Sequence, residues 1–211
     1  MILLTVFASS FIIALSGAMM PGPLLTVTIS ESSRRGASAG PLMIFGHGLL
    51  EIGLVTALFS GFAALLQSDQ VFITVALLGG GVLLWMGFSM LRSLPTIVLP
   101  RTGTSETRQN LVLAGVVLSL CNPYWLIWWV SIGMGYILHS ARFGPAGIGA
   151  FLCGHLLADL AWYSLISLGV ARGRAWFSPG LYRALIGFCS VVLLGFSGFF
   201  FASGLGKLMA S

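Results

Sequence analysis

Six apolar runs, each long enough to cross a lipid bilayer, occupy most of the chain and restrict how it can fold. A hydrocarbon layer of about 30 Å takes about 20 residues of helix, and a helix satisfies its own backbone groups there. Only 7% of the 211 residues are charged, against roughly 25% in a soluble domain. The sequence therefore predicts an all-α integral membrane protein. The expected spans run from Ile2 to Ile29, Ala37 to Leu66, Val71 to Leu91, Leu111 to Leu138, Gly144 to Val170 and Leu181 to Leu205.

Two pairs of ionisable residues lie in the middle of these runs. His47 and Glu51 are four residues apart in the second run, and His155 and Asp159 are four apart in the fifth. Residues at this spacing share one face of a helix, so the members of each pair can touch. An ionisable side chain at bilayer depth costs at least about 2.5 kcal/mol, and it normally faces a transport or proton path inside the bundle. We therefore predict that all four take part in substrate binding or proton coupling. The structural alternative is a hydrogen-bonded pair that locks two helices together.

Two proline motifs interrupt the first and fourth runs. Pro21, Gly22 and Pro23 follow one another in the first run, and Asn122 precedes Pro123 in the fourth. Proline removes a backbone donor and clashes with the preceding turn, so a break is expected at each motif. Broken helices in transporters line the binding site, and these five residues are predicted to do so.

Aromatic residues accompany both kinds of motif. Tyr124 follows the second break, and Trp162 and Tyr163 follow Asp159. We expect these three aromatics along the substrate pathway. For three further tryptophans the sequence leaves two options open, a pathway lining or a belt at the membrane interface; these are Trp125, Trp128 and Trp129.

The motifs recur in the same order, which predicts an internal repeat. A proline break, a Gly-His-x-x-x-acid motif and a plain helix follow one another twice, with Glu51 in the first copy and Asp159 in the second. Three helices per copy is an odd number, so the second copy enters the membrane from the opposite side. We expect a 3+3 inverted-topology repeat, in which residues 1–94 and 111–211 form the halves and residues 95–110 form a cytoplasmic linker. Pro23 lies deeper in its span than Pro123 does, so the two breaks need not match in depth.

Basic residues gather on one side of the expected spans. Eight arginines fall on the side of the link after the first span, against only Arg142 and Lys207 on the other. By the positive-inside rule the arginine-rich side is cytoplasmic, which places both termini outside. No basic stripe with interleaved aromatics occurs, so a nucleic-acid partner is not expected. The cysteines are three in number and all lie in apolar runs, so no disulfide is expected.

The chain resembles the LysE/RhtB family of bacterial inner-membrane exporters over essentially its whole length. The resemblance rests on three features: the Pro-Gly-Pro motif of the first run, the glycine-rich second run with Glu51, and Asn122-Pro123 in the fourth run. The resemblance implies a six-helix secondary carrier that exports amino acids or related small solutes using the membrane potential or a proton gradient. It also implies a bacterial or archaeal cytoplasmic membrane. The histidines and Asp159 are less general in that family, and many members carry lysine where this chain has Tyr124, so the substrate is left open.

The leading hypothesis is therefore a proton-coupled exporter of a small amino acid or related amine. Its expected partners are a small-molecule substrate, protons and the lipid bilayer, while the small-residue helix faces permit a homodimer. The alternative is an exporter of divalent metal cations, with His47, Glu51, His155 and Asp159 as four ligands. A metal site needs all four to converge, whereas proton coupling allows two pairs on either side of a cavity, which is the arrangement we expect. No Cys-x-x-Cys, nucleophile-base set or cofactor loop is present, so neither an enzyme nor a cofactor is expected.

Overall fold

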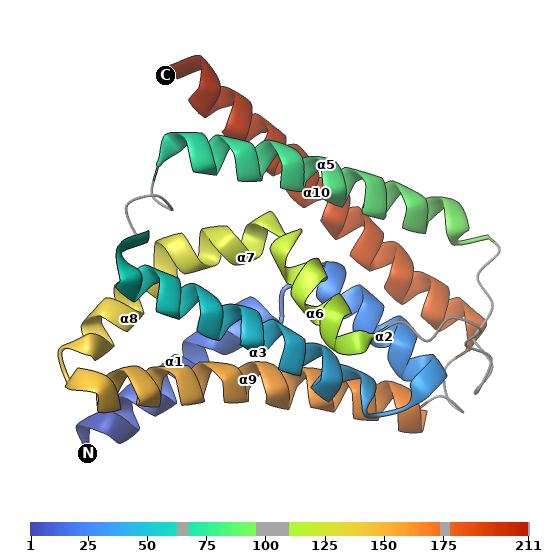
Figure 1. Ribbon diagram of the computed structural model, residues 1–211. Helices are drawn as coiled ribbons and strands as arrows, with labels where there is room; N and C mark the ends of the chain where they lie inside the picture. The colour runs from blue at the N-terminus through green and yellow to red at the C-terminus, as the bar shows by residue number, and fades with distance from the viewer. Residues whose placement is uncertain (63–67, 96–109, 174–177, 211) are drawn as a thin grey trace.

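The computed structural model describes residues 1–62, 68–95, 110–173 and 178–210, and these residues form helices and no strand (Figure 1). Most of the expected linker, residues 96–109, lies outside the described residues. The helices are α1 (Ile2–Ala18), α2 (Pro23–Arg35), α3 (Ala39–Ala57), the π-helical turn η1 (Leu58–Phe62), α5 (Asp69–Ser93), α6 (Leu111–Leu120), α7 (Pro123–Trp128), the π-helical turn η2 (Trp129–Gly133), α8 (Met134–Ala141), α9 (Gly144–Gly173) and α10 (Pro179–Ala210).

Four of these helices are long and apolar enough to cross a membrane alone. They are α3 continued to Gly61, α5, α9 and α10. Two bent pairs pass the same test, α1 with α2 and α6 with the segment Pro123–Ala141, so the described residues hold up to six candidate spans. The prediction of an all-α membrane protein is confirmed, with four to six spans.

Both proline motifs break a helix. The chain bends by 81° between α1 and α2 and by 65° between α6 and the segment Pro123–Ala141. Pro23 and Pro123 are each the first residue of the new helix, where a missing N–H costs nothing. The breaks differ in depth, because α1 has 17 residues before its break and α6 has 10. Each break exposes backbone groups inside the bundle, which a continuous helix would not.

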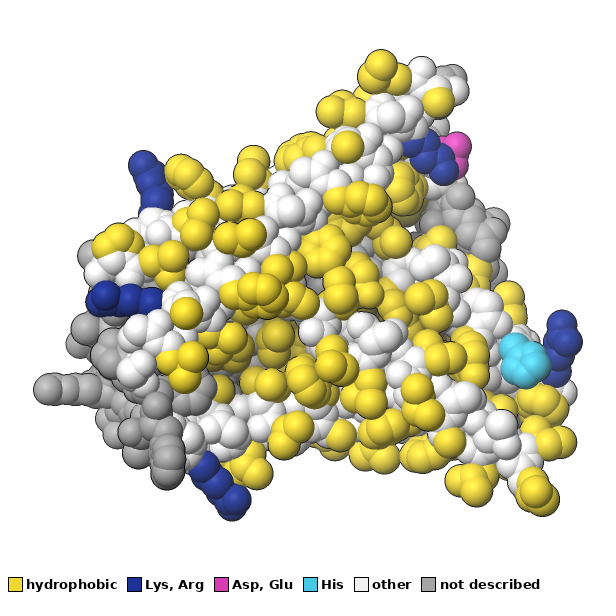
Figure 2. All heavy atoms as spheres, turned by 180° about the vertical axis from the view of Figure 1, so that it is seen from behind, with side chains coloured by type: hydrophobic (Ala, Val, Ile, Leu, Met, Phe, Trp, Pro, Cys, Tyr) yellow, Lys and Arg dark blue, Asp and Glu magenta, His cyan; other side chains and the backbone are white. Residues whose placement is uncertain are grey.

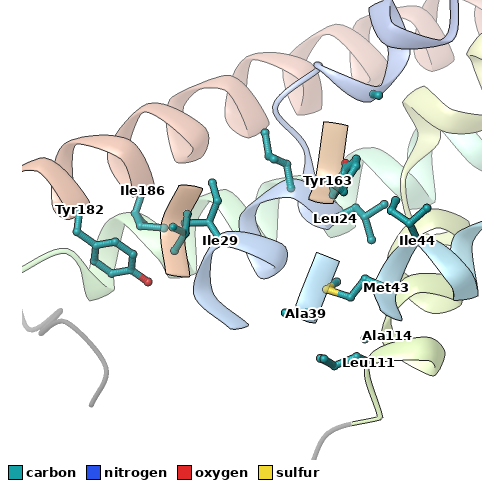
Figure 3. Close-up of a cluster of buried hydrophobic side chains, with 13 residues drawn as sticks. Leu24, Ile29, Ala39, Met43, Ile44, Leu111, Ala114, Tyr163, Tyr182 and Ile186 are labelled. Carbon is teal, nitrogen blue, oxygen red and sulfur yellow. The ribbon is translucent and has the colours of Figure 1, made fainter. Parts of the chain in front are cut away.

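The helices pack in two groups (Figure 1). The long helices α5 and α10 run side by side, and α1, α3 and α9 lie together on the other side of α6 and α7. Helix α3 contacts both α6 and α9, while α1 packs along α9. A buried apolar cluster joins the first-half helix α2 to α9 and α10 (Figure 3). The fold thus places α3 and α9, which carry the His-acid pairs, beside each other in the bundle interior.

Glycines allow the closest of these helix contacts. A Cβ atom on Gly46 of α3 would run into the backbone carbonyl of Val112 in α6, and one on Gly154 of α9 would run into that of Phe7 in α1. Small residues at such crossings let membrane helices approach closely. Each of these two glycines immediately precedes a site histidine, so the same contact that packs the helices also fixes the position of the imidazole.

The surface agrees with a membrane-spanning bundle. Apolar side chains cover the middle of the face seen in Figure 2, while lysine and arginine side chains lie toward its two ends. Several large apolar side chains are strongly exposed on α5 and α10, such as Leu78 at 70%, Trp85 at 69% and Val191 at 62%. Because exposed apolar surface of this extent is costly in water, the bilayer is the natural solvent for this face.

A first prediction concerns the glycine contact between α3 and α6. Gly46→Ala should lower the thermal unfolding midpoint of the detergent-solubilised protein, since overpacking costs about 1–3 kcal/mol. Gly53→Ala on the same helix is the matched control, because a Cβ there meets no atom within 4 Å. An equal midpoint for the two variants would contradict the close packing of α3 on α6.

Candidate functional site

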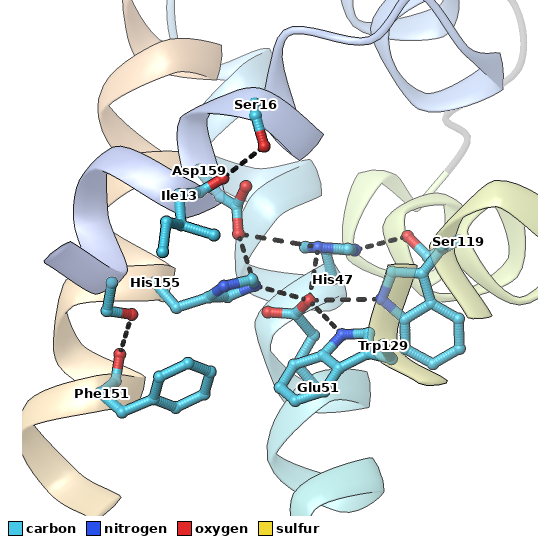
Figure 4. A network of polar contacts seen from close by, with 11 residues as sticks. Ile13, Ser16, His47, Glu51, Ser119, Trp129, Phe151, His155 and Asp159 are labelled. Carbon is cyan, nitrogen blue, oxygen red and sulfur yellow. Dashed lines mark hydrogen bonds and ion pairs between the residues drawn. The ribbon is translucent and has the colours of Figure 1, made fainter. Parts of the chain in front are cut away.

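Two histidines and two carboxylates meet at one point in the bundle interior (Figure 4). His47 Nε2 lies 3.2 Å from Glu51 Oε1 within α3, and His155 Nε2 lies 3.4 Å from Asp159 Oδ2 within α9. The pairs also contact each other: His155 Nε2 is 3.0 Å from Glu51 Oε1, and His47 Nε2 is 3.8 Å from Asp159 Oδ2. No residue of the four is more than 8% exposed. We call these four residues the His-acid cluster.

Glu51 is the centre of the cluster. Its Oε1 accepts a hydrogen bond from the indole N–H of Trp129 at 2.9 Å and another from that of Trp125 at 3.2 Å. The two tryptophans are four residues apart, on either side of the junction between α7 and η2, so both indoles face α3. An indole N–H can only donate. Oε1 is therefore held as an acceptor, with two indoles and two imidazoles directed at it.

The orientation of His47 is set from α6. The Ser119 hydroxyl donates to the backbone carbonyl of Gly115 at 2.7 Å, so its oxygen is free to accept from His47 Nδ1, also at 2.7 Å. With Nδ1 as the donor to Ser119, the other ring nitrogen points at the two carboxylates. The imidazole thus connects α6 to the acids of α3 and α9.

A pocket opens beside the cluster at the two helix breaks. The chain from Met20 to Leu24 lines it, as do Asn122, Tyr124 and the four cluster residues. Helices α5 and α10 contribute only apolar side chains, Leu83 from the first and Leu193 and Phe196 from the second. The pocket encloses about 710 Å³ not filled by atoms, including the part open to the exterior.

Several polar atoms at this pocket are buried without a hydrogen-bond partner among the described residues. They are Glu51 Oε2, Asp159 Oδ2, His155 Nδ1 and Trp128 Nε1. Buried polar groups are nearly always paired, so an unpaired set in one place indicates a ligand or water site. Of these four atoms, Asp159 Oδ2 is still ion-paired, because it lies 3.4 Å from His155 Nε2 and 3.8 Å from His47 Nε2.

The structure brings together most of the residues singled out from the sequence. Pro21, Gly22, Pro23 and Asn122 line the pocket, as do Tyr124 and Tyr163. Two residues are not at the pocket wall. Pro123 is buried against Gly79 of α5, and Trp162 packs beside the apolar cluster of Figure 3.

The expected separation of the two His-acid pairs is wrong. We expected the pairs on either side of a cavity, but His155 approaches Glu51 more closely than it approaches its own partner Asp159. The reason is the small-residue packing of α3 on α9: Gly40 of α3 touches the backbone of Tyr163 in α9, so the two helices leave no room for a cavity between their acids.

Sequence reasoning missed several site residues. For Trp125 and Trp129 the sequence allows either a pathway lining or an interface belt, whereas in the structure their indoles donate to Glu51. Their i, i+4 spacing one turn after a helix break, at bilayer depth, was the available signal. No sequence pattern marks Ser119 as a site residue. Leu83 and Leu193 lie on helices whose sequences predict only a packing role.

The cluster is also able to hold a divalent cation. Ligand atoms of His47, Glu51 and Asp159 all lie within 4.8 Å of one another, and imidazole nitrogen with carboxylate oxygen is a donor set that suits zinc. Four ligands at about 2.0–2.1 Å from a tetrahedral ion lie about 3.3 Å apart. The separations in the cluster, 3.0 to 3.8 Å, are close to that value, and the shorter ones are equally ordinary hydrogen bonds.

A second prediction tests the hydrogen bond from the Trp129 indole to Glu51. Trp129→Phe keeps the ring but removes the N–H donor at 2.9 Å, and a hydrogen bond to a charged group contributes about 1.5–3 kcal/mol. The variant should unfold at a lower temperature, and the loss should shrink in a Glu51→Gln background. Trp85→Phe, on the exposed face of α5, serves as control. Equal losses in both backgrounds would show that Trp129 acts through packing alone.

Comparison with known proteins identifies the family. A family model described as LysE type translocator matches residues 15–204. A protein of Pseudomonas aeruginosa named chemotactic transduction protein ChpE is 28% identical over 201 residues, which cover 93% of this chain and 97% of the relative. A leucine efflux protein of Enterobacter is 30% identical over 128 residues, covering 58% and 59%. A putative amino acid efflux protein of Bacillus subtilis is 24% identical over 211 residues, covering 98% and 100%.

No solved structure matches the chain. The family match spans both helix breaks, the whole His-acid cluster and all the residues that line the pocket except Ala14. The chain therefore belongs to the LysE family of translocators and is a multi-pass transport protein of the bacterial inner membrane.

Proposed function

We propose that this protein is a secondary active exporter of a small amino acid or related amine, coupled to protons and working by alternating access. The observation that carries the proposal is the buried His-acid cluster, which lines one pocket together with residues of both helix breaks. Ionisable groups in such a position normally serve transport. Two relatives are named for efflux, one of leucine and one of amino acids, which supports the choice of substrate.

The coupling follows from the contacts within the cluster. Nε2 of His47 and Nε2 of His155 each contact both Glu51 and Asp159, so either nitrogen can take a proton from one acid and pass it to the other. A substrate ammonium in the pocket competes with that proton for the same carboxylates. Substrate and proton then exchange rather than bind together, which is the requirement of an antiporter.

We infer a 3+3 inverted repeat from the way equivalent helices pack. In such a repeat α1 corresponds to α6 and α3 to α9, so the packing of α1 on α9 should match that of α6 on α3. Both contacts occur. The equivalence extends to atoms: Ser10 of α1 donates to the carbonyl of Phe151, and Gly115 of α6 packs against the carbonyl of Met43. Residues 151 and 43 both lie four positions before a site histidine.

The repeat supplies the two states that export needs. Two halves of similar shape but opposite orientation allow a conformation open to each side around one fixed site. Residues 1–94 and 111–211 form the halves in this proposal, with residues 95–110 as a cytoplasmic linker. Arg34, Arg92 and Arg172 lie at the ends of their helices on the linker side. The positive-inside rule then makes that side cytoplasmic and puts both termini outside.

Export of a divalent cation is the second candidate function. The convergence of His47, Glu51 and Asp159 to within 4.8 Å favours it, since separate pairs would have excluded a shared ion. The indole N–H groups on Glu51 argue for the first candidate, because a donor that already occupies Oε1 competes with a cation for it. We therefore rank the metal exporter second.

A third prediction tests the carboxylates. Glu51→Gln and Asp159→Asn keep size and remove the charge, so both variants should insert in the membrane and lose proton-driven export in vesicles. Asp69→Asn is the matched control, because Asp69 is an exposed acid paired with Lys207 away from the pocket. Wild-type export by both cluster variants, with an unchanged dependence on pH, would make the cluster structural.

A fourth prediction separates the two candidate functions. If the cluster holds protons and substrate, the purified protein should show no stoichiometric binding of Zn²⁺ or Mn²⁺ in the micromolar range by titration calorimetry. One-to-one binding that disappears in the His47→Ala, His155→Ala double variant would instead establish the metal exporter. The single variant Cys153→Ala provides the control for adventitious binding to the exposed thiol.

A further inference from the structure

The segment after the second helix break departs from a regular α-helix at the point where it reaches the His-acid cluster. Residues Trp129–Gly133 form the π-helical turn η2, and the N–H of Met134 donates to the carbonyl of Trp129, five residues back rather than four. Single π-helical turns are rare, and they occur frequently at functional sites. Trp129 begins this turn and donates to Glu51, while Gly133 ends the turn.

Gly133 is packed against indoles rather than against a neighbouring helix. A Cβ atom on it would lie 2.6 Å from Cε3 and 3.0 Å from Cδ2 of Trp129, and 2.9 Å from Cζ3 of Trp128. At Gly46 and Gly154 the nearest atom is instead a backbone carbonyl oxygen of another helix. Those two glycines serve helix packing, whereas Gly133 leaves room for two tryptophan rings of its own segment.

Helix geometry explains why a side chain at this position would meet the two rings. The Cα–Cβ bond of a helical residue tilts toward the N-terminus of the helix, so each side chain covers the turn before it. Trp128 and Trp129 lie one turn before Gly133. Even the methyl group of alanine would therefore overlap the rings, and glycine is the residue that fits.

The Trp129 ring is enclosed by other rings. The residue is 1% exposed, and its ring centroid lies 5.3 Å from that of His155, 5.7 Å from that of Trp128 and 6.1 Å from that of Phe151. Because protein interiors are close-packed, an added methyl group fits only if the indole or the backbone moves. The indole N–H lies 2.9 Å from Glu51 Oε1, and a hydrogen bond weakens steeply when it is misaligned. A displaced ring therefore alters the contact with the carboxylate.

We propose that Gly133 is a positioning residue of the transport site, which acts through the Trp129 indole on the Glu51 carboxylate. Because Gly133 has no side chain, the indole lies where its N–H meets Oε1, and Oε1 in turn lies 3.0 Å from His155 Nε2. This inference rests on the proposed function, in which the His-acid cluster carries transport. It adds to the site a residue that has no polar side chain and does not line the pocket.

Indole signals in NMR spectra of the full-length protein test the proposal. The chain has six tryptophans, and each indole N–H signal is assigned from the matching Trp→Phe variant. Gly133→Ala should shift the Trp129 signal in the direction of a weaker hydrogen bond. Gly135→Ala, the matched control, should leave it in place, because a Cβ on Gly135 meets no atom within 4 Å. An unmoved Trp129 signal in Gly133→Ala would overturn the proposal.

Proton-driven export of leucine from vesicles gives a second readout. Gly133→Ala should lower export at least about tenfold, the loss expected when a hydrogen bond to a charged group is broken, while Gly135→Ala should retain wild-type export. In a Trp129→Phe background, which has no N–H to displace, Gly133→Ala should lower export further by no more than about twofold. Equal losses in both backgrounds would show that the alanine acts through packing alone, and this result would overturn the proposal.

A second variant decides the case in which Gly133→Ala does not fold. Phenylalanine in place of Trp129 lacks Cε3, the atom nearest to the position of a Cβ on Gly133. The double variant Trp129→Phe, Gly133→Ala should therefore fold, which would support the proposal. A double variant that also fails to fold would overturn it.

The positioning role and the proposed function fail separately. A shifted Trp129 signal in Gly133→Ala, together with no export of any solute by the wild-type protein, would leave the placement of the indole by Gly133 standing and overturn the exporter. Export by the wild-type protein, together with an unmoved Trp129 signal in Gly133→Ala, would overturn the positioning role and leave the exporter standing.

Discussion

The hydrogen bonds that converge on Glu51 are the interaction on which the interior of this protein depends. Glu51 is only 1% exposed, so water cannot offset the cost of burying its carboxylate. Its hydrogen-bond donors must therefore come from the chain. The donors come from four elements: His47 from α3, His155 from α9, Trp125 from α7 and Trp129 from η2. The cluster thus ties both halves of the chain to one oxygen atom.

The helix breaks follow from the same requirement. A straight helix through residues 111–141 would carry its indoles past α3 at a fixed rotation, whereas the 65° bend at Asn122 turns the new helix so that both reach Glu51. The 81° bend in the first half opens the start of α2 to the pocket. Proline makes each break inexpensive, since the donor it lacks is one that a new helix does not use.

More of the fold than of the site could be predicted from the sequence. Long apolar runs and prolines are local signals, and they gave the helical membrane class and both breaks. The i, i+4 spacing of His47 with Glu51 and of His155 with Asp159 also gave the contact within each pair. Whether the two pairs meet depends on how closely α3 approaches α9, which Gly40 decides through a contact 123 residues away with Tyr163. No local pattern reports such a distance, so the separation that we expected was wrong.

The two halves repeat the same motif but do not surround it equally, and this difference gives the acids different roles. After Pro123 the chain places two indoles on Glu51, while the residues after Pro23 are leucine, threonine and valine and offer no equivalent donor to Asp159. Among the residues that the structure describes, the ion-pair contacts of Asp159 Oδ2 are the two imidazoles at 3.4 and 3.8 Å. In the proposed function, Glu51, with the larger number of hydrogen bonds, holds the cluster together, and Asp159 exchanges partners more readily. The proposed exporter would use both: a charge that keeps the site assembled in either conformation, and a charge that proton and substrate occupy in turn.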